Sequence, residues 1–267
     1  MNSRDSITEC LSSLRASGVG QLIVVDARST DGTREIAQQF ADLIVEDPGL
    51  GLGLARNFGI RESTGALVLN LGSDNILPAG ALEQMIQDLD SLNVDGVSAQ
   101  TQIQGNGFIS RGLNAWRAGR FRPGYVSVIG TPTLFVGDRL RANPFDPEAI
   151  YSDDSELCER WSSEFDARFA ISTATVQESG KATWREVRIR CRMYGISDFE
   201  IYSKGCNSGW KITRRLKSIQ HPLKADLITP LLHLPIRSAL ANTPFLLTFT
   251  SLRYFYWSKA AVRHNKS

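Results

Sequence analysis

The chain has 267 residues, of which 42% are hydrophobic and 22% are charged. This length and apolar content fit one large α/β domain, alone or with a smaller appendage, and they exclude a globally disordered chain. Lys and Arg total 30 against 28 for Asp and Glu, so the formal net charge is only +2.

The charge is distributed unevenly along the chain. Residues 181–267 hold 16 basic and 4 acidic residues, a net charge of +12, which leaves −10 for residues 1–180. An acidic front part beside a basic back part indicates two roles. The basic part is either a solvated surface or a contact site for phosphates or an anionic membrane.

The cysteines and the N-terminus bear on the compartment. No CxxC pair occurs, and the spacing fits neither a zinc site nor a disulfide framework, so we expect a reducing, cytoplasmic setting. The first ten residues, "MNSRDSITEC", lack the apolar core of a signal peptide. The most apolar stretch, residues 227–252, is interrupted by His, Arg and Pro; it allows an interfacial hairpin and argues against a spanning helix.

The first hundred residues alternate between helical and strand-like segments. Helices are predicted at 5–18, 29–41, 51–63 and 78–91, and strands at 21–27, 42–49, 66–74 and 94–103. Ser29 or Thr30 is the expected N-cap of the second helix. This alternation predicts an α/β fold with a Rossmann-like, mostly parallel sheet flanked by helices. Ligands bind at the carboxyl ends of strands in such sheets, where Asp26 and Asp74 lie.

The rest of the chain has weaker periodicity. Residues 104–150 show none that is clear, apart from 125–136, which predict either a strand pair or one strand with a bend at Gly130 and Pro132. A helix is predicted after Asp153, and another over 182–195. The second of these helices has an apolar stripe formed by Val187, Cys191 and Tyr194. A separate stripe combines an aromatic residue with two basic ones: Trp184, Arg188 and Arg192.

The stretch "GLGLGLARNFG" (49–59) invites a dinucleotide-binding interpretation. The fingerprint G-x-G-x-x-G requires a third glycine, where this chain has Leu54 or Arg56. An NAD(P) site therefore stands as an alternative to a plain glycine-rich turn.

Five motifs together resemble family 2 glycosyltransferases of the GT-A fold. In order they are "IVVDARSTDGT", "GLARNFGI", "ALVLNLGSDNILPAG", "ANPFD" and "YSDDSEL", and the resemblance covers about residues 2–195. It implies transfer of a sugar, with inversion, from a nucleotide-sugar donor, expected to be a UDP-sugar, to a saccharide or polyprenyl-linked acceptor. It also implies a GT-A domain at 1–180, with a nucleotide-binding half at 1–75 and an acceptor half at 76–180. Residues 181–267 would form a basic helical extension.

The resemblance implies a divalent metal, Mg²⁺ or Mn²⁺, which neutralises the departing diphosphate. Asp74 matches the second Asp of the family's Asp-x-Asp motif, and Gly72 stands at the first. Ser73 or Asn75 is expected to assist donor binding. Gln177 stands near the place of a metal-binding His, so Arg188 and Arg192 are expected to hold the diphosphate directly. The alternative is that both arginines are solvated and Trp184 packs in the core.

The resemblance also assigns donor contacts and a base. Asp26 matches the aspartate at the uracil or ribose, and Arg56 matches the arginine on the base and diphosphate side. Asp154 matches the catalytic base, which takes the proton of the acceptor hydroxyl. Asp153 is expected to contact substrate and to raise the pKa of Asp154 by repulsion. A helix N-cap is the structural alternative for this pair.

The tail "LRYFYWSKAAVRHNK" (252–266) is basic and aromatic, so we expect peripheral contact with the inner face of the plasma membrane and none with nucleic acid. The aromatic residues behind this expectation are Phe245, Tyr254, Phe255, Tyr256 and Trp257. The rival function is a non-catalytic GT-A homologue that binds a nucleotide sugar or a partner. Gly72, Gln177 and the apparent lack of the family's first strand favour that rival.

Overall fold

The computed structural model describes residues 1–148 and 153–264. The chain forms two compact units. The first comprises residues 1–102 and 123–179, and the second comprises residues 103–122 and 180–267. The second unit therefore combines the C-terminal region with a segment from the middle of the chain, which the sequence motifs assign to the domain at 1–180.

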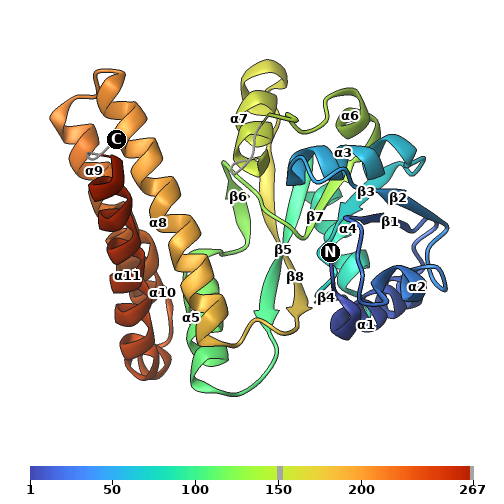
Figure 1. The fold of residues 1–267 in the computed structure, drawn as a ribbon, viewed down its shortest axis with the longest axis horizontal. Coiled ribbons are helices and arrows are strands. Elements are labelled where there is room, and N and C mark those ends of the chain that lie inside the picture. Colours follow the sequence, from blue (N-terminus) through green and yellow to red (C-terminus); the bar gives the residue numbers. More distant parts are fainter. Residues whose placement is uncertain (149–152, 265–267) are drawn as a thin grey trace. The chain divides into compact units, whose positions relative to one another are not determined.

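The first unit opens with alternating helices and strands (Figure 1). In order these are α1 (Arg4–Ala16), β1 (Ile23–Asp26), α2 (Thr33–Ala37), β2 (Leu43–Glu46), α3 (Leu52–Glu62), β3 (Leu67–Asn70), β4 (Asn75–Ile76), α4 (Ala81–Ser91) and β5 (Gly96–Ile103). After residue 122 it continues with β6 (Gly124–Val126), β7 (Thr133–Val136), α6 (Gly137–Ala142), α7 (Asp153–Phe165) and β8 (Phe169–Glu178).

The strands form a parallel pair, β1 with β2, and a six-stranded sheet in the order β3-β7-β5-β8-β4, with β6 beside β8. β7 is antiparallel to both β3 and β5, so those two strands share one direction. Figure 1 shows β5 and β8 pointing the same way. The strands that run against them, β4, β6 and β7, have at most four residues each. The predicted α/β class and mostly parallel sheet flanked by helices are confirmed.

Two apolar cores stabilise this unit. The larger one packs the buried face of α1 and of α4 against the sheet; Ile7, Cys10, Leu11 and Leu14 recur at helical spacing on α1. The smaller one is aromatic, with Phe135, Phe145, Trp161 and Phe169 all buried. Trp161 donates from Nε1 to the carbonyl of Asn143 at 3.0 Å. This second core fixes α7, the helix that begins with Asp153 and Asp154.

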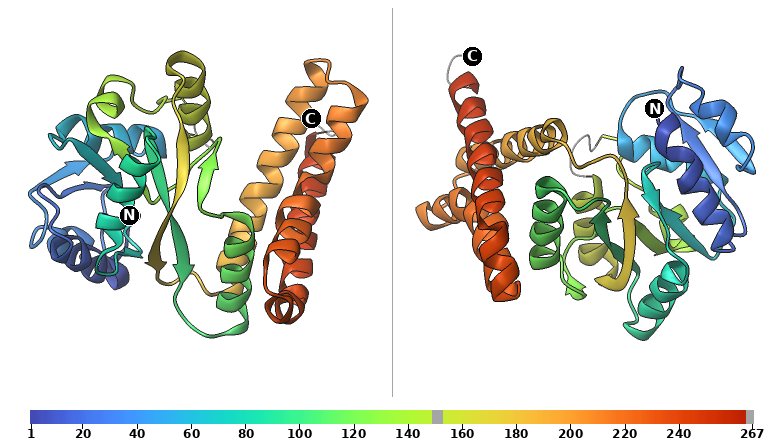
Figure 2. Two further views of the ribbon diagram at one scale, coloured as in Figure 1. Left: turned by 180° about the vertical axis from the view of Figure 1, so that it is seen from behind. Right: turned by 90° about the horizontal axis from the view of Figure 1, so that it is seen from below.

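The second unit is helical. It consists of α5 (Phe108–Arg120), α8 (Trp184–Asn207), α9 (Ile212–Leu223), the π-helix η1 (Lys224–Ile228), α10 (Thr229–His233) and α11 (Ile236–His264). Figure 2 shows α11 as the long red helix. Gly112 and Gly195 permit close helix packing, because a Cβ would lie 2.1 Å from the Phe245 ring in the first case and 2.5 Å from the Arg253 carbonyl in the second. The predicted C-terminal helical part is confirmed.

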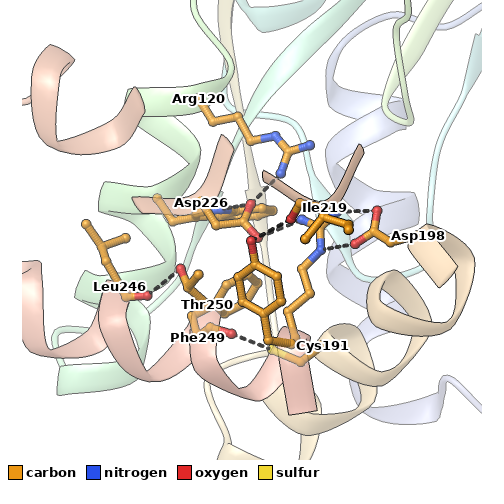
Figure 3. A network of polar contacts seen from close by, with 11 residues as sticks. Arg120, Cys191, Asp198, Ile219, Asp226, Leu246, Phe249 and Thr250 are labelled. Carbon is orange, nitrogen blue, oxygen red and sulfur yellow. Dashed lines mark hydrogen bonds and ion pairs between the residues drawn. The ribbon is translucent and has the colours of Figure 1, made fainter. Parts of the chain in front are cut away.

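A buried ionic network crosses this unit (Figure 3). Asp226 in η1 is fully buried and accepts from Trp116 Nε1 at 3.0 Å, from Arg120 and from Arg253 Nη1 at 2.6 Å. Arg253 also pairs with both carboxyl oxygens of Asp198, at 2.7 and 2.9 Å. The network joins α5, α8, η1 and α11. Its hydrogen bonds and ion pairs offset the cost of removing the Asp226 carboxylate from water.

Three local expectations were wrong. The N-cap of α2 is Gly32 at φ 92°, not Ser29 or Thr30, because Ser29 hydrogen-bonds to Asp26 instead. α5 was not expected, since its buried face includes the small residues Ser110, Gly112 and Gly119, which carry no hydrophobic signal. α8 continues to Asn207, well beyond the predicted end at residue 195.

Candidate active site

Arg56 lies between two carboxylates from a distant part of the chain. Its Nη1 donates to Asp153 Oδ2 at 2.8 Å and to Asp154 Oδ1 at 2.7 Å, while Nη2 donates to the Thr131 hydroxyl. Only 12% of the Arg56 side chain is exposed. Ion pairs with so little exposure are weakly screened by solvent and hold their groups firmly.

The local sequence explains how α3 comes so close to α7. A Cβ on Gly53 would lie 3.2 Å from the Asp146 carbonyl and 3.3 Å from Asp153 Cβ, so a larger residue there would push the two segments apart. One turn later, the Asn57 amide donates to the Phe145 carbonyl at 2.7 Å and accepts from the Phe145 N–H at 3.0 Å. Gly53 is therefore a close-packing residue, whereas Gly49 and Gly51 form a turn at positive φ.

The pKa of the Asp154 carboxyl is raised from its ordinary value. Burial is the largest cause, because it penalises the charged form; the Arg56 guanidinium opposes it, and the Asp153 carboxylate adds to it. The Thr131 backbone N–H also favours the ionised form. A base whose pKa is raised in this way accepts a proton more readily while remaining paired in the resting state.

Asp74 stands at a second corner of the first unit, after β3. Asn75 closes the turn, since its Oδ1 accepts from the Gly72 N–H at 3.0 Å and its own N–H donates to the Gly72 carbonyl at 3.0 Å. The Asp74 carbonyl accepts from Ser179 N–H at the end of β8, at 2.9 Å. The side chain of Asp74 is half-buried, so it faces solvent in part.

Gly72 bears directly on the position of Asp74. A Cβ at residue 72 would lie 2.8 Å from Asp74 Oδ1 and 3.1 Å from Asn75 Oδ1, closer than side-chain atoms tolerate. Ser73 points elsewhere, with its hydroxyl donating to the Ser3 hydroxyl at 2.8 Å. The glycine at the first position of the motif is thus part of what allows the Asp74 carboxylate to occupy its present place.

Asp26 lies in a turn of its own at the end of β1. It is buried, and its two carboxyl oxygens accept from the Ser29 hydroxyl at 2.6 Å and from the Ser29 N–H at 3.2 Å. Arg28, two residues further along, is exposed and pairs with Glu46 at 2.7 Å.

The remaining predicted site residues belong to other elements. Arg188 and Arg192 are on α8 in the second unit, and both side chains are exposed. Gln177 lies on β8, opposite Ile76 of β4. Within residues 1–148 and 153–264, no three His, Cys, Asp or Glu side chains gather as a metal site would require.

Residues that position the site were missed by the sequence analysis. Asn57 and Phe145 join α3 to the segment before α7, and the Phe145 ring lies 5.0 Å from the Arg56 guanidinium carbon. Thr131 lies within hydrogen-bonding distance of Arg56. The motifs "ARN" and "PFD" contain the first two residues, but nothing in the sequence indicated that they bind each other.

The sheet flanked by helices, with its C-terminal helical part, is the GT-A fold. The family described as Glycosyl transferase family 2 matches residues 1–146, so the chain belongs to that family. The glycosyltransferase AglE of Haloferax volcanii is 31% identical over 112 residues, which are 38% of this chain and 37% of AglE. The chain therefore matches well under half of AglE.

Solved structures share the fold at low sequence identity. A mannosyltransferase from Pyrobaculum calidifontis, in complex with GDP-Man and Mn²⁺, is 19% identical with a TM-score of 0.59, over 96% of this chain and 82% of that one. S. aureus TarS 1-349 in complex with UDP-GlcNAc is 15% identical with a TM-score of 0.52, over 99% and 89%. Among the described helices, none has both the length and the apolar composition needed to cross a bilayer.

Proposed function

We propose that the chain transfers a sugar, with inversion, from a nucleotide-sugar donor to a saccharide or lipid-linked acceptor. The observation that carries this proposal is the placement of Asp154 beside Arg56 and Asp153, because it supplies a partly buried carboxylate with a raised pKa. Family membership supports glycosyl transfer in general. A UDP-sugar is the proposed donor, and the UDP-GlcNAc complex of TarS is consistent with it.

The proposed reaction uses Asp154 as the general base. As the acceptor hydroxyl attacks the anomeric carbon, its proton passes to the Asp154 carboxylate. The new carbon–oxygen bond forms on the face opposite the diphosphate, whose bond to the sugar breaks and which leaves with the electron pair. One displacement from the opposite face inverts the anomeric centre.

Arg56 has two uses in this scheme. In the resting protein it compensates the charges of Asp153 and Asp154. The donor's diphosphate is a competing anion of higher charge, so donor binding would draw the guanidinium away from Asp154. The Asp154 carboxylate would then be a stronger base. Asp26 and Ser73 complete the proposed donor contacts within the first unit.

A divalent metal fits the residues present if the donor supplies most of its ligands. Mg²⁺ commonly binds one or two carboxylates together with substrate phosphates and water. Asp74 would be that carboxylate, and the metal would neutralise charge on the diphosphate. Mn²⁺ accompanies GDP-Man in the Pyrobaculum enzyme. Metal-dependent donor binding that Asp74→Asn weakens would support this assignment.

The test of the proposed function separates binding from turnover. The purified chain is titrated with UDP-GlcNAc and GDP-Man in the presence of Mn²⁺, and donor hydrolysis is measured in parallel. We expect donor binding, slow hydrolysis by the wild type, and no turnover by Asp154→Asn with donor affinity retained. Normal hydrolysis by Asp154→Asn would overturn the assignment of the base.

A non-catalytic homologue is the second candidate, and Gly72, at the first position of the Asp-x-Asp motif, favours it. Such a protein would bind donor without hydrolysis or transfer under any metal. Donor binding with no turnover by the wild type, across Mg²⁺ and Mn²⁺ and several saccharide acceptors, would decide for this candidate.

A further inference from the structure

The long helix α11 is apolar on two opposite sides. Its inner side packs into the core of the second unit through Phe245, Leu246 and Phe249, all fully buried. Its outer side carries exposed apolar residues at Ile236, Leu240, Leu247, Phe255 and Val262. At 3.6 residues per turn these fall within about 100° of the helix circumference, opposite the buried residues. Ile236 and Leu240, at the start of the helix, are 78% and 71% exposed.

This outer face has no charged residue along its centre. The positions between the apolar side chains are Pro244, Ser251 and Ser258, all exposed. The stripe spans residues 236–262, which corresponds to roughly 40 Å of helix. Basic side chains stand along one edge, at Arg237, Lys259 and Arg263. An uncovered apolar stripe of this length is unusual on the surface of a monomeric protein.

The charge around the stripe restricts what can cover it. Between Ile201 and His264 the sequence has ten Lys or Arg residues and one acidic residue, Asp226. Asp226 is fully buried in the ionic network, so the surface of this region presents cations without carboxylates. A second copy docked face to face would place like charges opposite each other. Nucleic acid would match the charge but would leave the apolar stripe uncovered.

We propose that α11 lies in the interface plane of an anionic membrane, with its outer face among the acyl chains and its basic edge at the headgroups. An apolar stripe bordered by Lys and Arg is the pattern of an interfacial helix. Of the aromatic residues behind the membrane expectation, Phe255 lies on this face, whereas Phe245 is buried and the Tyr254 hydroxyl donates to the Ile219 carbonyl at 2.7 Å. The inference rests on the proposed function, because the proposed lipid-linked acceptor would be found at such a membrane.

The test measures binding of the full chain to vesicles of phosphatidylcholine alone or mixed with phosphatidylglycerol. We expect binding to the anionic vesicles only, weakened by salt. Replacing Arg237, Lys259 and Arg263 together by Gln should weaken it by about fivefold for each cation removed. Ile236→Asn with Leu240→Asn should weaken it by at least tenfold, because each substitution removes a buried apolar side chain.

Leu50→Asn is the matched control, since Leu50 in the first unit is 68% exposed and outside the stripe. It should bind vesicles as the wild type does, and circular dichroism should show all variants folded. Equal binding to neutral vesicles, or unchanged binding of the double Asn variant, would overturn the proposal. A concentration-dependent dimer that Leu240→Asn dissociates would assign the face to a second copy instead. Asp154→Asn should bind vesicles normally, so a failure of the proposed transfer reaction would remain distinguishable.

Discussion

Arg56 and Asp154 are 98 residues apart in the chain, yet Arg56 Nη1 lies 2.7 Å from Asp154 Oδ1. The same nitrogen contacts Asp153, so one guanidinium compensates two adjacent carboxylates. The pair links the helix that follows β2 to the helix that precedes β8. Any change in one partner therefore alters both the charge and the position of the other.

The acid limb of the pH profile should move in opposite directions for two variants. The pKa of Asp154 is raised by burial, lowered by Arg56 and raised by Asp153. Only the ionised carboxylate is a base, so activity falls as the pH drops through this pKa. Arg56→Met removes the favourable charge and should shift the limb to higher pH; Asp153→Asn removes the repulsion and should shift it to lower pH. Log kcat/KM against pH measures both, and shifts of the same sign would contradict the assignment.

Substitution at Gly72 should disturb Asp74. In Gly72→Ala the new Cβ would lie 2.8 Å from the present position of Asp74 Oδ1, so the carboxylate must move. Displacing a metal-bound carboxylate or its support typically weakens metal affinity about 10–100-fold. We expect a loss of that order in Mn²⁺-dependent donor binding, measured by calorimetry. Gly20→Ala is the control, because a Cβ there meets nothing within 4 Å; equal effects of the two would refute a specific role for Gly72.

Asn57→Ala should loosen the contact between α3 and the segment before α7. The substitution leaves the Phe145 N–H and carbonyl without their side-chain partner. Unsatisfied buried groups cost about 1–3 kcal/mol each, so the free energy of unfolding should fall by at least about 1 kcal/mol. Urea titration measures it, with the exposed Asn106→Ala as the control. A change below the error of the titration would show that water replaces the lost bonds.

Asp226→Ala should be among the most destabilising substitutions in the second unit. It leaves Arg253, 4% exposed, and Trp116 without their buried acceptor. Breaking a buried pair costs about 3–5 kcal/mol.

Asp226→Asn keeps one acceptor and tests the same contact should the Ala variant fail to fold. The control is Asp138→Asn, whose ion pair with Arg141 is exposed and is worth at most about 1 kcal/mol. Comparable losses for Asp226→Asn and Asp138→Asn, measured by urea titration, would contradict a special role for the network.

Much of the first unit could be predicted because its signals are local. Short apolar runs such as Leu67–Asn70 alternate with amphipathic helices such as α1, and each is bounded by glycine or polar residues. α5 was missed because Gly112 and Gly119 pack against other helices through the absence of a side chain, which weakens the hydrophobic pattern. Its assignment depends on residues more than a hundred positions later.

The site divides in the same way. The order of the motifs predicted that Asp154 and Arg56 belong to the site. It did not predict that they contact each other, because that contact depends on Gly53 and on the pairing of Asn57 with Phe145. Asp26 was expected at the end of a strand, where it lies, but the strand expected to reach Asp74 ends at Asn70, and Asp74 lies in the turn before β4. The aromatic residues of α11 could not be sorted from the sequence, because spacing alone did not show which side of the helix faces the core: Phe245 is buried and Phe255 is exposed.

The ionic network around Asp226 can be completed only after the last part of the chain has been synthesised. Trp116 and Arg120 are made early, but Asp226 follows 106 residues after Arg120, and Arg253 comes 27 residues after that. Until the ribosome has released Arg253, the aspartate lacks its innermost cation. A chain that terminated before α11 would leave α5 beside an incompletely neutralised acid, so early termination should harm a helix that was translated long before the break.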